Sequence, residues 1–78
     1  MKLAGVPSVA VQSSLLSSVG YNPEASTLLL ELRDGALYQY SEVPAEIHHN
    51  LLAAESKGNY FNRRIRDHFQ HKLIRQPR

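Results

Sequence analysis

The chain has 78 residues, 42% of them hydrophobic, and a formal net charge of +2. A chain of this length builds one domain around one core, and its apolar content is typical of a globular rather than a disordered protein. The absence of cysteine excludes disulfides and thiolate metal sites and fits a reducing compartment. The apolar run near the start is interrupted by Pro7 and is too short to span a membrane. We therefore expect a soluble, cytoplasmic protein with no membrane partner.

Charge is distributed unevenly along the chain. Residues 1–56 carry two basic and six acidic side chains, whereas residues 57–78 carry seven basic side chains and one acidic, so the net charges of the two segments are −4 and +6. An uneven distribution of this kind is typical of a chain whose basic part binds an anionic partner. It is equally typical of a small protein that a basic tail keeps soluble. The charge pattern alone leaves both interpretations open.

Three antiparallel strands are predicted in the first half of the chain. Residues 13–21 alternate, so that Leu15 and Val19 share one face while Leu16 lies on the other with small residues. An Asn-Pro turn leads to the second strand, the leucine-rich run at residues 27–33. An Asp-Gly pair then closes a hairpin to the third strand.

The length of the hairpin loop at residues 34–35 determines where Tyr38 and Tyr40 point. A two-residue loop places both tyrosines on the face opposite the leucines. A three-residue loop, with the glycine left-handed in a bulge, pairs Leu30 with Tyr38 and adds the aromatics to the leucine face. Leu28 then pairs with Tyr40. A slip of one residue reverses every side chain, and we favour the bulge because it gathers the large apolar groups on one face.

Two short helices are predicted after the strands. Pro44 begins the first helix, whose apolar stripe faces the core, and Lys57-Gly58 ends it with Gly58 in the left-handed conformation. Asn59 caps the second helix, which continues to about Asp67. Its inward-facing residues, spaced four apart, are Phe61, Ile65 and Phe69, and its outward-facing residues are Arg63, Arg66 and, in part, Arg64.

The predicted fold is therefore α+β, a three-stranded antiparallel meander followed by two short helices in the order β-β-β-α-α. The domain covers residues 13–69. Residues 1–12 form an N-terminal extension that is partly flexible, and residues 70–78 form a basic tail. This tail either adds a short edge strand through Leu73 and Ile74 or frays.

Seven short segments between residues 13 and 69 stand out together: Ser13-Ser14, Val19-Gly20-Tyr21, Tyr38-x-Tyr40, Val43-Pro44, Ser56-Lys57-Gly58, Tyr60-Phe61-Asn62 and Ile65-Arg66. In their order and spacing they resemble the KTSC domain, which is named for its occurrence at the C-terminus of some lysyl-tRNA synthetases. The domain also occurs as a stand-alone bacterial protein of about this length. The resemblance supports the α+β fold, and its synthetase context implies RNA binding.

Catalysis is the least supported interpretation. Nucleophilic catalysis needs a serine, a nearby base and a group that orients the base, and nothing in the sequence places the serines beside the histidines. His68 and His71 have a spacing that could bind a metal, but no third ligand accompanies them. No paired carboxylates, glycine-rich phosphate loop or nucleotide fingerprint is present. We therefore expect a binding module without enzymatic activity, cofactor or metal.

Basic residues at and beyond the junction of the two helices are the first candidate binding site. Lys57 and Gly58 precede the second helix, whose free N–H groups and positive dipole end could hold an anion. If Asn59 caps those groups, or if Lys57-Gly58 only ends the first helix, this site is closed. The basic side chains that follow are suited to phosphate contacts of low sequence preference, and they are Arg63, Arg64, Arg66 and Lys72.

Tyrosines form the second candidate site. Tyr38 and Tyr40, two apart on a strand, can stack successive bases of RNA. The bulged register favours instead that both pack beneath the helices with their hydroxyls at a polar rim. Tyr60, beside the arginines and off the apolar stripe, is then the better-exposed aromatic. We expect an RNA-binding module; alternatively, the arginines bind an acidic protein, or the edge near Leu73 pairs with a strand of a protein partner.

Overall fold

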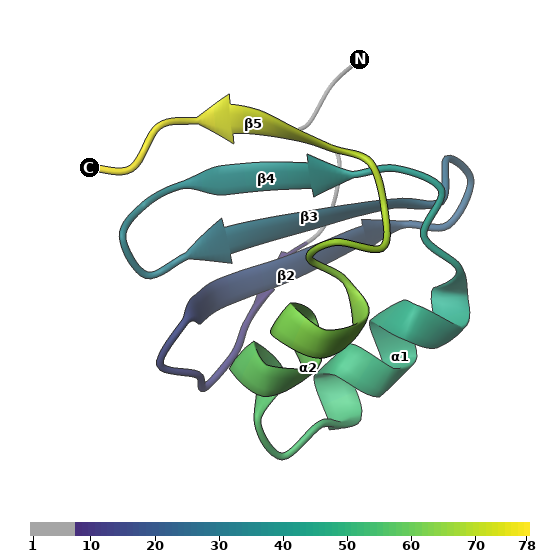
Figure 1. Cartoon of the computed structure of the whole chain (residues 1–78), viewed down its shortest axis with the longest axis horizontal. Coiled ribbons are helices and arrows are strands. Elements are labelled where there is room, and N and C mark those ends of the chain that lie inside the picture. Colours follow the sequence, from purple (N-terminus) through teal and green to yellow (C-terminus); the bar gives the residue numbers. More distant parts are fainter. Residues whose placement is uncertain (1–7) are drawn as a thin grey trace.

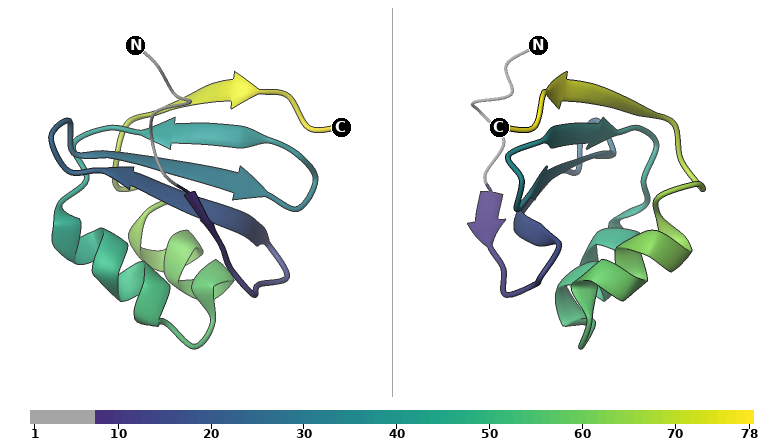
Figure 2. Two further views of the ribbon diagram at one scale, coloured as in Figure 1. Left: turned by 180° about the vertical axis from the view of Figure 1, so that it is seen from behind. Right: turned by 60° about the vertical axis from the view of Figure 1, so that its left-hand side comes forward.

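The computed structural model describes residues 8–78 as one five-stranded antiparallel sheet and two helices. The strands lie in chain order across the sheet, and both helices cover the same face of it (Figures 1 and 2). The elements are β1 (Ser8–Ala10), β2 (Leu16–Asn22), β3 (Thr27–Leu32), β4 (Leu37–Tyr40), α1 (Ala45–Ala53), α2 (Lys57–Arg64) and β5 (His71–Arg75).

The α+β class and the three central strands agree with the prediction, but the strand count of three is wrong. The edge strand expected near Leu73 and Ile74 is present as β5, which pairs with β4. The strand β1 was not predicted and lies in the segment assigned to an N-terminal extension, where Val9 pairs with Val19. Three residues are too few for an alternating pattern to reveal a strand. Residues 1–7 of that extension lie outside the described residues.

The hairpin between β3 and β4 has the predicted three-residue loop. Gly35 has a φ of 97°, and its N–H donates to the Leu32 carbonyl at 2.9 Å. The strands pair Leu30 with Tyr38. Leu28 pairs with Tyr40, so both tyrosines lie on the leucine face that the helices cover. This register sets the position of the site described below.

A bulge in β2 makes the predicted orientation of Leu16 wrong. Leu16 lies opposite Leu32, yet Ser18 lies opposite the adjacent Glu31, so β2 contains one extra residue at this point. The extra residue reverses the alternation and brings Leu16 onto the same face as Val19. Both side chains are buried in the core. The strict alternation assumed from the sequence cannot reveal such an insertion.

The junction between the helices also differs from the prediction. Ser56, rather than Asn59, caps α2, because its Oγ accepts from the Asn59 backbone N–H at 3.2 Å. Gly58 lies in the first turn of α2 and does not end α1 in a left-handed conformation. A Cβ at this position would lie 3.3 Å from the Leu15 Cβ. The glycine therefore permits close packing of α2 against the segment before β2.

The core lies between the helices and the sheet. Its buried members are Leu16, Val19, Leu28, Leu30, Tyr40, Val43, Leu51, Phe61 and Ile65. The predicted inward orientation of Phe61 and Ile65 is confirmed, and Phe69 packs against this core while partly buried. Within residues 8–78, neither helix is long and apolar enough to cross a membrane.

Candidate functional site

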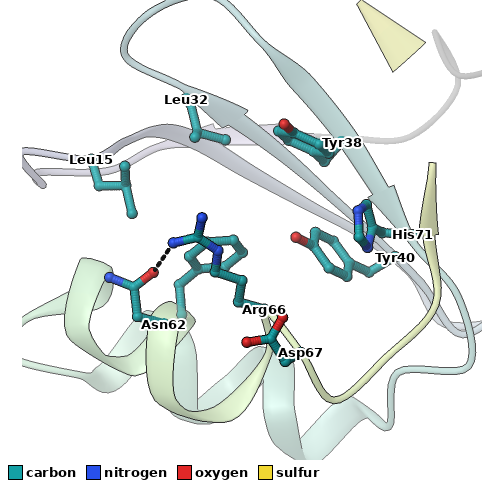
Figure 3. Close-up of a pocket in the computed structure, with 9 residues that line it drawn as sticks. Leu15, Leu32, Tyr38, Tyr40, Asn62, Arg66, Asp67 and His71 are labelled. Atoms are coloured by element: carbon teal, nitrogen blue, oxygen red, sulfur yellow. Dashed lines mark hydrogen bonds between the residues drawn. The ribbon is translucent and has the colours of Figure 1, made fainter. Parts of the chain in front are cut away.

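A pocket of about 400 Å³ opens between β4, the end of α2 and the start of β5 (Figure 3). Its lining residues come from β4, from the start of β5, and from α2 and the residues that follow it, together with Leu15 and Leu32. The residues that line it are Leu15, Leu32, Tyr38, Tyr40, Phe61, Asn62, Arg66, Asp67 and His71. The pocket therefore combines an apolar wall with several polar and ionisable groups.

Two tyrosine hydroxyls reach into this pocket from β4. Tyr38 and Tyr40 share a face because they are two apart on the strand, and both line the pocket, with the Tyr40 hydroxyl directed toward Arg66 (Figure 3). Tyr40 is only 2% exposed, and its ring meets Phe61 edge to face with centroids 5.8 Å apart. The predicted packing of the tyrosines beneath the helices thus holds for Tyr40. Tyr38 is only partly buried.

Arg66 approaches the same space from the opposite side. The Phe61 carbonyl accepts from the backbone N–H of Ile65 at 3.0 Å and from that of Arg66 at 2.9 Å, so the last turn of α2 is wide. After this turn the Arg66 side chain lies over the pocket, where Nη1 donates to Asn62 Oδ1 at 3.4 Å (Figure 3). Arg66 is exposed, as predicted, although it lines the pocket, but the prediction that the helix continues to about Asp67 is wrong. The helix ends at Arg64.

The environment of Tyr40 keeps its hydroxyl protonated. Burial raises the pKa of Tyr40 to about 12, the neighbouring Tyr38 and Asp67 act in the same direction, and Arg66 opposes them. Across the neutral range the hydroxyl is therefore a hydrogen-bond donor. An oxygen atom that carries negative charge is the acceptor that suits it best.

Three aromatic rings form one wall of the pocket. The centroids of Tyr38 and His71 are 5.7 Å apart, and those of Tyr40 and His71 are 5.2 Å apart. His71 comes to this wall because β5 pairs it with Tyr40. A planar group that enters the pocket meets aromatic surface on this side.

The arginines near the end of α2 differ from those at the end of the chain. Arg63 and Arg64 are exposed in the last turn of α2. In the described part of the chain, the ion pairs involve only Glu31, which lies 2.5 Å from Arg75 and 4.0 Å from Arg78. The cationic groups at the end of α2 are thus without a carboxylate partner in residues 8–78.

Several predicted site residues lie away from the pocket. Lys72 pairs with Gln39 and therefore points to the other face of the sheet. The Lys57 Nζ donates to the Ala54 carbonyl at 3.0 Å, and Gly58 packs on Leu15.

Tyr60 is not the well-exposed aromatic that we expected. It packs against the core, and its hydroxyl is buried without a hydrogen-bond partner in residues 8–78. The packing of Tyr60 against the core therefore also buries its polar hydroxyl. Of the nine predicted residues, the structure gathers Tyr38, Tyr40 and Arg66 at the pocket and leaves Arg63 and Arg64 exposed nearby in the chain.

Three polar residues of the pocket were not predicted as site residues. In the sequence, Asn62 stands out only as part of a segment that resembles the family, and Asp67 only as the expected end of a helix. His71 stands out only for its metal-binding spacing to His68. The His68 Nε2 instead lies 3.0 Å from the Arg63 carbonyl, and residues 8–78 contain no cluster of three metal-ligating side chains. Only the pairing of β5 with β4 reveals the position of His71.

The chain is similar to proteins of one family. The family model of the KTSC domain matches residues 12–69. The crystal structure of a KTSC domain protein from Yersinia pestis superposes with a TM-score of 0.88 and 34% identity, covering 91% of this chain and all of the other. An uncharacterized protein of Stutzerimonas stutzeri is 52% identical over 54 residues, which are 69% of this chain and 76% of that protein.

A longer relative, an enzyme by its name, contains a region that is similar to this chain. A lysine–tRNA ligase of Nostoc sp. is 33% identical over 68 residues, which are 87% of this chain but only 12% of the ligase. The chain thus corresponds to a small part of that enzyme.

Proposed function

Because the chain belongs to the KTSC domain family, we propose that it is a cytoplasmic RNA-binding module without enzymatic activity of its own. A relative whose name ties it to tRNA contains a region similar to nearly the whole chain. The proposal transfers that association with RNA, and not the ligase reaction, to this domain. The single observation that carries it is Arg66, which lines an aromatic pocket and, like the exposed Arg63 and Arg64 in the last turn of α2, has no carboxylate partner in residues 8–78.

This arrangement suits the chemistry of RNA. Arg63, Arg64 and Arg66 offer guanidinium groups to phosphate oxygens, contacts that position a strand without reading its sequence. The aromatic wall of Tyr38 and His71 offers a surface on which an unstacked base can rest. The two features lie at the same end of α2, so one single-stranded segment can use both.

Replacing Arg63 and Arg64 together by glutamine tests the proposal. We expect weaker binding of a fluorescently labelled single-stranded RNA, measured by anisotropy at several salt concentrations. The plot of log K against log salt should become shallower by about 0.7 for each phosphate that the variant no longer neutralises. Both residues are exposed, so the melting temperature should stay nearly unchanged.

Lys72→Gln provides the matched control, since it also removes one exposed positive charge but on the other face of the sheet. It should change affinity and salt slope less than Arg63→Gln alone. Equal effects of the two substitutions would mean that net charge, and not this surface, drives binding. No binding of RNA at low salt would refute the proposal.

An acidic protein partner is the second candidate, and β5 is the observation that favours it. This strand pairs with β4 on one side only and carries Leu73, which is 41% exposed. An extended segment could add to this edge while its acidic residues meet the arginines. A pull-down with and without nuclease treatment separates the candidates: a defined protein retained after nuclease supports the second, and its loss supports RNA.

A further inference from the structure

The pocket holds hydrogen-bond donors that lack a protein acceptor. Among residues 8–78, the only tyrosine hydroxyl that donates to another residue is that of Tyr21, which bonds the Val43 carbonyl at 2.6 Å. The Tyr40 side chain is almost fully buried, yet its hydroxyl points into the pocket that Tyr38 also lines (Figure 3). The only buried side-chain polar atom without a partner in residues 8–78 is the Tyr60 hydroxyl, so the Tyr40 hydroxyl is not sealed in the core and a ligand that enters the pocket can accept from it.

The two tyrosines and Arg66 line one pocket from opposite sides. The Arg66 guanidinium lies across the pocket from the Tyr40 hydroxyl and uses one N–H for the long contact to Asn62, which leaves its other N–H groups available (Figure 3). Two hydroxyls and one guanidinium can each serve a different oxygen of a phosphate monoester. That group carries three acceptor oxygens and nearly two negative charges at neutral pH. An internal phosphodiester offers only two such oxygens and one charge.

The size and the walls of the pocket suit a ligand larger than phosphate alone. Its volume of about 400 Å³ leaves room beyond the anion for a sugar and a base. The rings of Tyr38 and His71 provide aromatic surface for the base. Tyr40 and Phe61, both nearly fully buried, close the inner side, so a strand that ends in the pocket fits better than one that passes through it.

We infer that this pocket binds a single nucleotide through its phosphate monoester. The nucleotide is either a free nucleoside monophosphate or the phosphorylated end of an RNA strand, and the chemistry of recognition is the same for both. The inference deepens the proposed function and rests on it for the choice of nucleotides as the ligand class. It assigns Tyr38, Tyr40 and Arg66 to the phosphate and His71 to the base.

Asp67 adds a negative charge at the edge of the same pocket. Its carboxylate influences the titration of Tyr40 and opposes the effect of Arg66 there. It should therefore weaken the binding of any anion at this position. Asp67→Asn keeps the shape of the side chain and removes the charge, so we expect it to tighten binding of the phosphate several-fold.

The test is a calorimetric and NMR titration of the full chain with AMP, adenosine and inorganic phosphate. AMP should bind, and adenosine should bind at least roughly tenfold more weakly, because a hydrogen bond to a charged acceptor contributes about that factor or more. Inorganic phosphate should compete with AMP but bind more weakly, since it lacks the base. Failure of folded protein to bind AMP at about 10 mM would overturn the inference.

Removal of single hydroxyls locates the binding. Tyr38→Phe and Tyr40→Phe each keep the ring and should weaken AMP binding roughly tenfold. Tyr60→Phe is the matched control, because it removes a hydroxyl that is buried outside the pocket. Circular dichroism would verify that each variant is folded. AMP affinity that is the same in the Tyr38, Tyr40 and Tyr60 variants would also overturn the inference.

Two RNA oligonucleotides of one sequence separate the sources of the phosphate. If a 5′-phosphate strengthens binding relative to a 5′-hydroxyl and AMP removes the gain, the pocket binds strand ends. If AMP binds and the 5′-phosphate has no effect, the ligand is a free nucleotide. The proposed function is tested separately with the 5′-hydroxyl RNA. It is supported if this RNA binds and if the Arg63 and Arg64 double variant binds it more weakly, and it is refuted if this RNA does not bind.

Discussion

The two ends of α2 carry similar residue types but use them differently. At its start, the Ser56 hydroxyl accepts from a backbone N–H, Lys57 bonds a carbonyl of the preceding loop, and Gly58 packs on Leu15. At its end, Arg66 and the tyrosines of β4 direct donors into a pocket. At the start of α2 the polar groups have protein partners and stabilise the fold, whereas the donors at the pocket face a space that a ligand can enter.

Alkaline pH should have the largest effect, at the pocket end. The pKa of Tyr40 is about 12 in the folded protein and about 10 in the unfolded chain, so between these values only the unfolded state loses the proton. The contribution to stability is present below pH 10 and is lost as the pH rises through 12, at a cost of about 2–3 kcal/mol.

Urea unfolding of the wild-type protein and of Tyr40→Phe from pH 9 to 12 measures this contribution. Lysines and the other tyrosines titrate in both proteins, so their effect on stability is shared. The wild-type protein should lose more stability than the variant over this range, because only it carries the Tyr40 hydroxyl. Parallel curves would show that the Tyr40 hydroxyl is not held in a buried, protonated state.

A larger side chain at Gly58 should have the next largest effect, at the start of the helix. Gly58→Val pushes atoms against Leu15, which already lies 3.3 Å from the position of a Cβ, and should cost about 2 kcal/mol. Asn59→Val, at the exposed neighbouring position, serves as the control for the poor helix propensity of valine. Equal midpoints of chemical unfolding for both variants would contradict the close packing.

The smallest pair of effects contrasts the two ends directly. Ser56→Ala removes the helix cap and should lower stability by about 1 kcal/mol without changing AMP affinity. Arg66→Gln should lower AMP affinity and leave stability within about 0.5 kcal/mol, since the side chain is exposed and makes only one long contact in the described chain. Thermal unfolding measures the stability of both variants, and calorimetry measures their AMP affinity. If Ser56→Ala weakened AMP binding and Arg66→Gln lowered stability, the roles assigned to the two ends of α2 would be contradicted.

Much of the fold was predictable because local patterns and long-range pairing agree. The bulge at Gly35 follows from an Asp-Gly pair and from the gain of packing Tyr38 and Tyr40 on the leucine face. The helix that begins after Pro44 follows from its apolar spacing. By contrast, β1 is too short to show a period, and the bulge in β2 disrupts the alternation on which the prediction for Leu16 depended.

The candidate site was only partly predictable for a related reason. Tyr38, Tyr40 and the arginines are visible as residue types, but their grouping depends on the wide turn that places Arg66 over the sheet. His71 enters the pocket through the pairing of β5 with β4, which joins distant segments of the chain. By residue type, Lys57 and Tyr60 are suited to a binding site. In the structure, however, Lys57 donates to the Ala54 carbonyl and Tyr60 packs against the core.

An NMR titration of isotope-labelled protein with a short 5′-phosphorylated RNA tests the central claim most directly. We predict that the amide shifts cluster at Tyr38, Arg66 and His71, at the pocket end of α2. The amides of Lys57 and Gly58, at the other end, should remain almost unchanged. Shifts that cluster at the start of α2 instead, or an absence of shifts at saturating RNA, would contradict the account.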